Sequence, residues 1–177
     1  MDKAKLDILE KEIVSCGKWA VEKQSTLHIE TKADSSPVTE VDLGISNRLL
    51  SLIKELFPEA AIITEEEITE DKKDAPYTFV LDPIDGTDVF SQGLPSFCIA
   101  LGILDTEFSP VGAMVYAPRF GVATTEGMLL RLDPEGELLL NGEKFQMTGD
   151  KDTVKQITMS VRLHAASTSP TSMESAV

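Results

Sequence analysis

Asp82-Pro83-Ile84-Asp85-Gly86-Thr87 follows directly on the apolar run Tyr77-Thr78-Phe79-Val80-Leu81. The run predicts a buried strand, and the stretch after it places two carboxylates, a glycine and a hydroxyl residue at the end of that strand. Gly86 would let the backbone approach a ligand closely. Carboxylate oxygens suit a hard cation such as Mg²⁺, and the N–H groups after a glycine suit phosphate. The same residue types also form Asp-Pro and Asp-Gly turns, so the stretch taken alone fits a hairpin equally well.

Two amphipathic helices are predicted before this stretch. Residues 3–24 carry apolar side chains at steps of three and four, and residues 40–57 repeat the pattern up to Pro58, which marks the end of the second helix. Between them, residues 26–29 fit a short extended segment. The predicted buried stripes comprise Leu6, Leu9, Ile13, Cys16 or Gly17, and Ala20 in the first helix, and Leu43, Leu49 or Leu50, Ile53 and Leu56 in the second.

From residue 61 the pattern changes to short strands separated by Gly, Pro, Asn and Asp. Asp133-Pro134-Glu135-Gly136 and Asn141-Gly142 are tight-turn sequences, which indicates an antiparallel meander in the later part of the chain. Helices followed by consecutive strands predict an α+β fold, with two long helices packed on a mostly antiparallel sheet. The strands are predicted at residues 61–64, 77–81, 96–104, 111–116, 121–125, 128–132 and 137–140.

Length and charge limit the functions that this chain can perform. Its 177 residues, 42% of them apolar, suffice for one domain with a real core. The net charge of −14 argues against nucleic-acid polymers and anionic membranes as partners, and no apolar run is long enough to span a bilayer. The N-terminus lacks a secretory signal, which favours a cytoplasmic protein. Cys16 and Cys98 lack metal-ligand spacing and are expected to be buried, reduced thiols.

Two further polar clusters have both a structural and a functional interpretation. Thr39-x-x-Asp42 has the form of a capping box, which would account for both residues. The run Glu65-Glu66-Glu67 follows the predicted strand at 61–64 and by itself is typical of a solvated loop. Carboxylates at the ends of neighbouring strands can also converge on one edge of a sheet, where their repulsion favours a bound cation. Three such clusters beside a glycine therefore favour a metal–phosphate site.

Together these motifs resemble the inositol monophosphatase superfamily, which includes Mg²⁺-dependent, lithium-sensitive phosphatases acting on inositol phosphates, 3′-phosphoadenosine nucleotides and fructose bisphosphate. The resemblance covers roughly residues 4–160. Within it, the sequence Ser36-Pro37-Val38-Thr39 favours the nucleotide-phosphatase branch. It implies the N-terminal half of the family's layered α/β/α sandwich. The matching segments are Lys32-x-Asp34-x-Ser36-Pro37-Val38-Thr39-x-x-Asp42, Thr64-Glu65-Glu66, Asp82-Pro83-Ile84-Asp85-Gly86-Thr87 with Phe90, Gly112-Ala113-Met114-Val115-Tyr116-Ala117-Pro118, and Asn141-Gly142.

The resemblance also implies a role for each site residue. Glu65 would bind a first Mg²⁺, Asp82 would bridge two metals, the Ile84 carbonyl would add a neutral oxygen, and Asp85 would bind the second metal. Glu66 would support these ligands without binding a metal itself. Thr87 and Asp42 would orient and deprotonate the attacking water, while the N–H groups of Gly86 and Thr87 would hold phosphate oxygens. Lys32 and Asp34 would belong to a mobile loop that flanks the site.

One departure from the family limits these expectations. Members normally continue into a second α/β half with a Trp-Asp motif, whereas the single tryptophan of this chain is Trp19 and its last residues are rich in Ser and Thr. We therefore expect a domain over residues 1–163, a disordered tail over 164–177 and an exposed apolar sheet surface that promotes self-association, with a homodimer as one form. The predicted function is Mg²⁺-dependent hydrolysis of a small phosphorylated metabolite. A truncated, catalytically deficient metal- or phosphate-binding protein and a domain without any site are the alternatives.

Overall fold

Two long helices come first in the chain and form the layer on which the sheet packs. The computed structural model describes residues 1–27, 29–31, 37–64, 68–70, 72, 74–120 and 127–146. Helix α1 (Lys3–Lys23) begins after Asp2, whose side chain accepts a hydrogen bond from the Ala4 backbone. It buries the predicted stripe, with both Cys16 and Gly17 inward. Trp19, off this stripe, packs on Gly44 of the second helix so closely that a Cβ there would lie 2.5 Å from the ring.

Helix α2 (Glu40–Leu56) begins with the predicted capping box. The buried side chains of this helix are Val41, Asp42, Ile45, Leu49 and Ile53. The prediction that Leu43 belongs to the buried face is wrong, because its side chain is half exposed. The capping box turns Asp42 inward at the first turn, and residues at steps of three and four from Asp42 then follow it onto the buried face.

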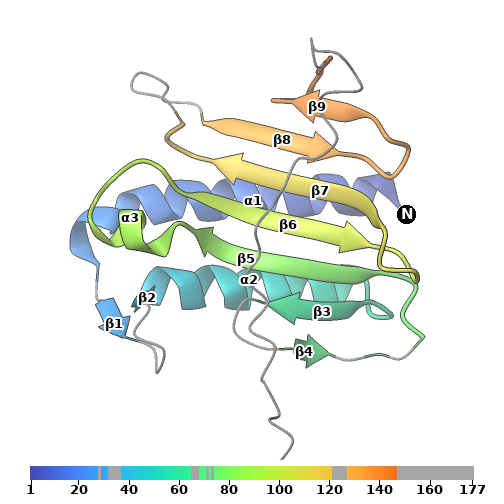
Figure 1. Cartoon of the computed structure of the whole chain (residues 1–177), viewed down its shortest axis with the longest axis horizontal. Helices are drawn as coiled ribbons and strands as arrows, with labels where there is room; N and C mark the ends of the chain where they lie inside the picture. The colour runs from blue at the N-terminus through green and yellow to red at the C-terminus, as the bar shows by residue number, and fades with distance from the viewer. Residues whose placement is uncertain are drawn as a thin grey trace, which may run out of the picture.

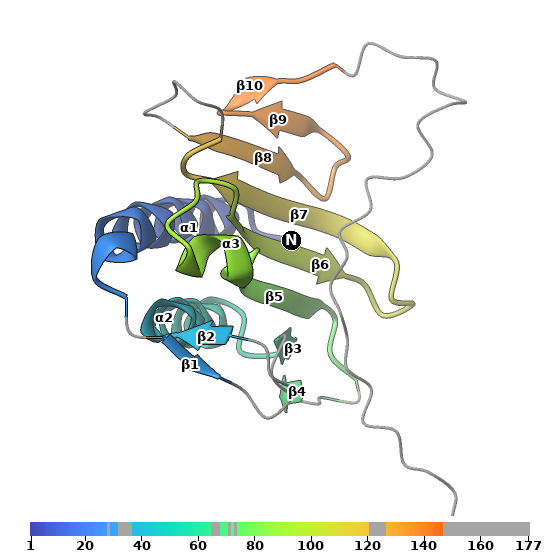
Figure 2. The same ribbon diagram turned by 60° about the vertical axis from the view of Figure 1, so that its left-hand side comes forward.

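Among the described residues, the sheet has eight strands in the order β10-β9-β8-β7-β6-β5-β3-β4, of which β3 and β5 pair in parallel and the other neighbours antiparallel. Figures 1 and 2 show this arrangement. The two long helices lie on the same face of this sheet (Figures 1 and 2). This confirms the predicted α+β fold. The strands are β3 (Ala61–Thr64), β4 (Ile68–Glu70), β5 (Thr78–Asp85), β6 (Cys98–Leu104), β7 (Pro110–Ala117), β8 (Met128–Leu132), β9 (Leu138–Leu140) and β10 (Glu143–Lys144).

Short elements at one end of the sheet differ in part from the sequence prediction. The 3₁₀ helix η1 (Gln24–Thr26) occupies the start of the predicted extended segment, and β1 (Ile29–Thr31) pairs with β2 (Pro37–Thr39) in a separate two-stranded sheet. Helix α3 (Thr87–Ser91) follows β5 at this end (Figure 1). Strand β4 was not predicted, and the predicted strand at 121–125 lies outside the described residues.

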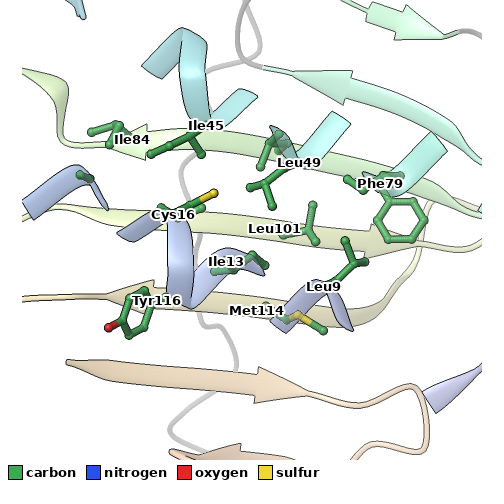
Figure 3. Close-up of a cluster of buried hydrophobic side chains, with 14 of the residues drawn as sticks. Leu9, Ile13, Cys16, Ile45, Leu49, Phe79, Ile84, Leu101, Met114 and Tyr116 are labelled. Carbon is green, nitrogen blue, oxygen red and sulfur yellow. The ribbon is translucent and has the colours of Figure 1, made fainter. Parts of the chain in front are cut away.

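The core lies between the two helices and the sheet. Figure 3 shows Leu9, Ile13 and Cys16 of α1 and Ile45 and Leu49 of α2 directed at side chains of the three central strands. Burying each such aliphatic side chain stabilises the fold by about 1.5–3 kcal/mol. Within the described part of the chain, no helix is both long and apolar enough to cross a membrane. The sheet partners that these helices cover are Phe79, Leu81, Ile84, Leu101, Met114 and Tyr116.

Candidate active site

A β-bulge brings Asp82 and Asp85 to the same face of the sheet. In a regular strand, residues three apart point to opposite faces. Here Asp82 pairs with Ala100 and Asp85 pairs with Cys98, so three steps along β5 correspond to two steps along β6. Paired residues share a face, and so do Cys98 and Ala100 on their own strand. The extra residue of the bulge therefore gives the two aspartates a common orientation.

Pro83 lies inside this bulge, which explains why the strand continues beyond the predicted end at Leu81. Proline lacks the N–H that a ladder hydrogen bond needs, so it is tolerated in a sheet chiefly at edges and bulges. The neighbouring Ile84 directs its side chain into the core, where it is fully buried (Figure 3). The Ile84 side chain thus holds this segment on the helix-covered face of the sheet, while the carboxylates of Asp82 and Asp85 lie on the opposite face.

The two aspartates differ in exposure and share one neighbour. Asp82 is 7% exposed, whereas Asp85 is exposed to solvent. The half-buried Cys98 lies with its Sγ 3.6 Å from Asp85 Oδ2. Burial, together with the negative charges of Asp85 and Asp82 and the hydrogen bond to Asp85, raises the pKa of this thiol to about 12. Cys98 is therefore a neutral thiol, as predicted, although it is less buried than expected.

Gly86 makes the turn from β5 into α3. Its φ of 96° lies in the left-handed region, and a Cβ at this position would be 3.0 Å from the Ser96 carbonyl oxygen. Both the backbone angle and the close approach require glycine. The next residue, Thr87, is the first of α3, so its hydroxyl projects beside the end of β5.

Asp42 serves the capping box and contacts Thr87 at the same time. Its Oδ2 accepts hydrogen bonds from the Thr39 hydroxyl and, at 2.9 Å, from the Thr39 backbone N–H. Its Oδ1 accepts from the Thr87 hydroxyl at 3.1 Å. The structural and functional interpretations of Asp42 are therefore compatible, since they use different oxygens of one carboxylate.

Burial raises the pKa of Asp42 above its ordinary value, although the hydrogen bonds from Thr39 and Thr87 oppose this shift. The Thr87 hydroxyl has one proton and a second acceptor within reach, the Ile84 carbonyl oxygen at 2.9 Å. When the proton points to Asp42, the lone pairs of Thr87 are free to accept from another donor. The pair can thus hold a water molecule and receive its proton.

The residues at this corner fit a hard cation by the chemistry of their donors. Asp82 and Asp85 supply carboxylate oxygens on one face, and Ile84 between them supplies a carbonyl oxygen. Oxygen ligands of this kind are preferred by Mg²⁺. The described residues contain no group of three or more His, Cys, Asp or Glu side chains that could hold a metal. The predicted third carboxylate, Glu65, lies outside the described residues, as do Glu66, Lys32 and Asp34.

A surface hollow of about 1440 Å³ adjoins the site. Asp85 and Gly86 line part of it, and the charged side chains Lys18, Glu22 and Arg119 also line it. Its apolar lining includes Phe97 and other side chains of the β6 and β7 ends. The hollow therefore offers space beside Asp85, and its lining carries two basic and two acidic side chains.

Sequence reasoning did not find Gln24, which is 7% exposed and hydrogen-bonded to Phe90 of α3 and to Leu94 after it. Its residue type and its position at the end of the predicted amphipathic helix are those of an ordinary surface residue. The β-bulge was also missed, because the pairing partner that reveals it lies more than ten residues further along the chain. Only the proline within the strand hinted at an irregularity.

The family follows from comparison with known proteins. The model of the inositol monophosphatase family matches residues 8–176. The chain belongs to the inositol monophosphatase family. The match begins slightly later in the chain than the predicted resemblance over residues 4–160 and ends later as well. An inositol monophosphatase (IMPase) of Thermotoga maritima superposes on 83% of this chain and 55% of its own, with a TM-score of 0.70 and 26% identity. The described fold is thus the N-terminal portion of the IMPase fold.

Relatives within this family bear several names. The Nus factor SuhB of Pasteurella multocida is 31% identical over 140 residues, which are 72% of this chain and 52% of the relative. The 3′(2′),5′-bisphosphate nucleotidase CysQ of Haemophilus influenzae is 32% identical over 98 residues, which are 54% of this chain and 36% of the relative. The chain therefore spans at most about half the length of these two relatives.

Proposed function

We propose that this protein hydrolyses a small phosphate monoester with the help of Mg²⁺. The observation that carries the proposal is the corner at the end of β5. A bulge orients Asp82 and Asp85 alike, and the adjacent Thr87 hydroxyl lies 3.1 Å from Asp42 Oδ1. Family membership supports the same chemistry, because relatives of this chain are named as inositol monophosphatases and as a bisphosphate nucleotidase.

Asp82, Asp85 and the Ile84 carbonyl would hold Mg²⁺ together with Glu65, while Glu66 would support them. Bound Mg²⁺ neutralises phosphate charge and lowers the pKa of a coordinated water. Asp82 is almost fully buried, whereas Asp85 is exposed and is proposed to adjust its position to a ligand. The N–H groups of Gly86 and Thr87 are proposed to hold the phosphate oxygens.

The attacking water is proposed to be activated by Thr87 and Asp42. Thr87 Oγ1 accepts a hydrogen bond from the water while its own proton is donated to Asp42 Oδ1, at 3.1 Å. As water attacks, its proton passes to Thr87 Oγ1 and the Thr87 proton passes to Asp42. Burial, which raises the pKa of Asp42, makes this carboxylate a stronger base than an exposed aspartate. The P–O ester bond breaks, and the alcohol leaves with a proton from solvent.

The substrate is proposed to be an inositol phosphate or a 3′-phosphoadenosine nucleotide. The hollow beside Asp85 and Gly86 can admit a molecule of this size, and Lys18 and Arg119 give part of it positive charge. Solved relatives include a dual-specific IMPase/NADP phosphatase bound with D-inositol-1-phosphate and a staphylococcal enzyme in an inhibitory complex after a LiCl soak. Inhibition by lithium is therefore part of the proposal.

The test is phosphate release from a panel of these monoesters, with and without Mg²⁺ and Li⁺. Asp82→Asn should abolish Mg²⁺-dependent release. Asp88→Asn is the matched control, because it removes the same charge from an exposed position on α3. Loss in the first variant alone supports the proposal. Equal activity of the wild type and Asp82→Asn, or activity that does not need Mg²⁺, contradicts it.

The alternative function is binding of a metal or phosphate without turnover. The observation in its favour is that two aspartates on one face beside a large hollow suffice for binding, whatever the rate of turnover. Absence of phosphate release combined with a higher melting temperature in Mg²⁺ would support this alternative, because a ligand that binds only the folded state stabilises it. A chain that neither releases phosphate nor responds to Mg²⁺ excludes both functions.

A further inference from the structure

Gln24 is a buried amide whose hydrogen-bonding groups all have partners in distant segments. Its Nε2 donates to the Phe90 carbonyl at 3.1 Å and to the Leu94 carbonyl at 2.8 Å, while its Oε1 accepts from Arg119 at 2.9 Å. The side chain is only 7% exposed. An amide offers two N–H donors and one carbonyl acceptor, and this arrangement uses each of them. Gln24 therefore joins the end of α1 to α3, to the residues that follow α3, and to Arg119 just beyond β7.

The contact reaches the candidate active site through α3. This helix has five residues, which is too short for stability without tertiary contacts. Phe90 N donates to the Gly86 carbonyl at 2.9 Å, and Gln24 holds the carbonyl of the same Phe90. Phe90 thus connects Gln24 to the turn at Gly86, since its carbonyl accepts from Gln24 and its N–H donates to Gly86. The Phe90 ring packs in the core against Phe97, with 4.6 Å between ring centroids.

We propose that Gln24 is a positioning residue for the Gly86–Thr87 turn. By holding the carbonyls of Phe90 and Leu94, it fixes the direction of α3 and so keeps the Thr87 hydroxyl on Asp42. The carbonyls at the end of a helix lack partners within the helix, so a side chain that binds them sets the angle at which the helix leaves. This inference rests on the proposed function only for the role of Thr87 in catalysis, since the hydrogen bonds of Gln24 are present whatever the protein does.

Three variants separate the donor and acceptor roles of the amide. Gln24→Met keeps the volume and removes all three hydrogen bonds. Gln24→Glu keeps an acceptor for Arg119 but has no N–H to donate to Phe90 and Leu94. Arg119→Met is the matched control, because it removes the contact to Arg119, an exposed residue, and leaves both carbonyl contacts intact. If Gln24→Met does not fold, Gln24→Glu decides the question.

The main readout is NMR on the full chain at a temperature where each variant is folded. The Asp42 carboxyl carbon is followed through a pH titration, together with the amide signals of Gly86 and Thr87. The hydrogen bond from Thr87 lowers the pKa of Asp42. Both Gln24 variants should therefore raise the pKa of Asp42 and shift the two amide signals, while Arg119→Met changes neither. A lower melting temperature with unchanged Asp42 titration and unchanged amide signals would mean that Gln24 only stabilises the fold, and would overturn the proposal.

A second readout applies to a chain that releases phosphate. The Gln24 variants should lower kcat by about tenfold or more while KM stays within about threefold, because small displacements of catalytic groups cost rate more than binding. A kcat that stays at the wild-type value in both Gln24 variants would contradict the positioning role. Arg119→Met serves as the control for the NMR readout alone, because Arg119 also lines the proposed substrate hollow. The NMR titration needs no turnover, so a chain without phosphatase activity refutes the proposed function and still leaves the role of Gln24 to be decided by that titration.

Discussion

Gly86 has two separate steric reasons to be glycine, and a matched variant can separate them. Gly86→Ala adds a Cβ at a φ of 96° and 3.0 Å from the Ser96 carbonyl. Gly93→Ala adds one at a φ of 78° with nothing within 4 Å. Backbone strain of this kind costs about 1–3 kcal/mol, and the close contact at Gly86 adds to it. Urea denaturation should show a larger loss of unfolding free energy for Gly86→Ala, and equal losses would contradict the steric role of Ser96.

The protonation of Asp42 makes a prediction about pH. Burial raises its pKa above the ordinary 3.8, so the folded protein binds this proton more tightly than the unfolded chain. The contribution of Asp42 to stability is therefore fully present below the ordinary pKa and is lost as pH rises through the raised pKa.

Asp42→Asn removes this titration. The unfolding free energy of the wild type minus that of the variant should fall as pH rises from about 3, and then level off above the raised pKa. Urea unfolding of both proteins at a series of pH values measures the difference, in which most other titrating groups cancel. A difference that grows with pH would show that the hydrogen bonds from Thr39 and Thr87 outweigh burial.

At the scale of elements, a buried ion pair network fixes α1 against β8. The Arg131 guanidinium lies 2.6 Å from Asp133 and 2.7 Å from both Asp7 and Glu10 of α1, and the Arg131 and Asp133 side chains are 4% and 2% exposed. Burial alone would lower the pKa of Arg131, but the hydrogen bonds to these carboxylates raise it, so the guanidinium stays charged.

Arg131→Met leaves Asp133 buried without its main partner, and we expect a loss of about 3–5 kcal/mol. Arg48→Met removes a comparable pair with Glu12 whose side chains are 37% and 29% exposed, and should cost about 1 kcal/mol or less. Chemical denaturation of the two variants gives both values. Similar losses would contradict the decisive role of burial.

The elements differ in how far the sequence predicts them. Local pattern sufficed for α1, whose stripe of apolar residues is regular, and for β8, which has the predicted bounds. It failed at Leu43, because the capping box at Thr39 sets the rotation of α2 and brings a polar Asp42 to the buried face. It failed at the bulge and at Gln24 because both depend on partners far away in the sequence. The motif residues of the site were recognised, whereas the contacts that orient them were not.

On the scale of the whole molecule, strands β7 and β8 present apolar side chains on the sheet face opposite the helices. Along β8, Leu129 and Arg131 are buried on the helix side. Met128, Leu130 and Leu132 are half exposed on the other face. In register, Leu130 lies beside Val115 and Leu132 beside Ala113. An antiparallel sheet with one solvated face normally alternates apolar and polar residues, and this one departs from that rule. The described residues thus support the expectation of self-association, which remains a prediction.

Variants of two neighbouring leucines test the prediction of self-association. Leu130→Gln should reduce self-association in sedimentation experiments and leave the circular dichroism spectrum unchanged. Leu129→Gln, on the covered face, should destabilise the fold by about 2–5 kcal/mol, because it loses apolar burial and introduces a buried amide. A wild-type chain that sediments as a compact monomer and binds no hydrophobic dye would refute the prediction.

Because of the bulge in β5, the candidate active site depends more on the number of residues between Asp82 and Asp85 than on which residues they are. Pro83 and Ile84 could be exchanged for other residues that tolerate a bulge and a buried position, and the two aspartates would keep their common face. Gain or loss of one residue between them would send Asp85 toward the helices, even though every chemical group of the motif would still be present. Among homologues, the spacing of the two aspartates should therefore resist insertion and deletion more strongly than the residues between them resist substitution.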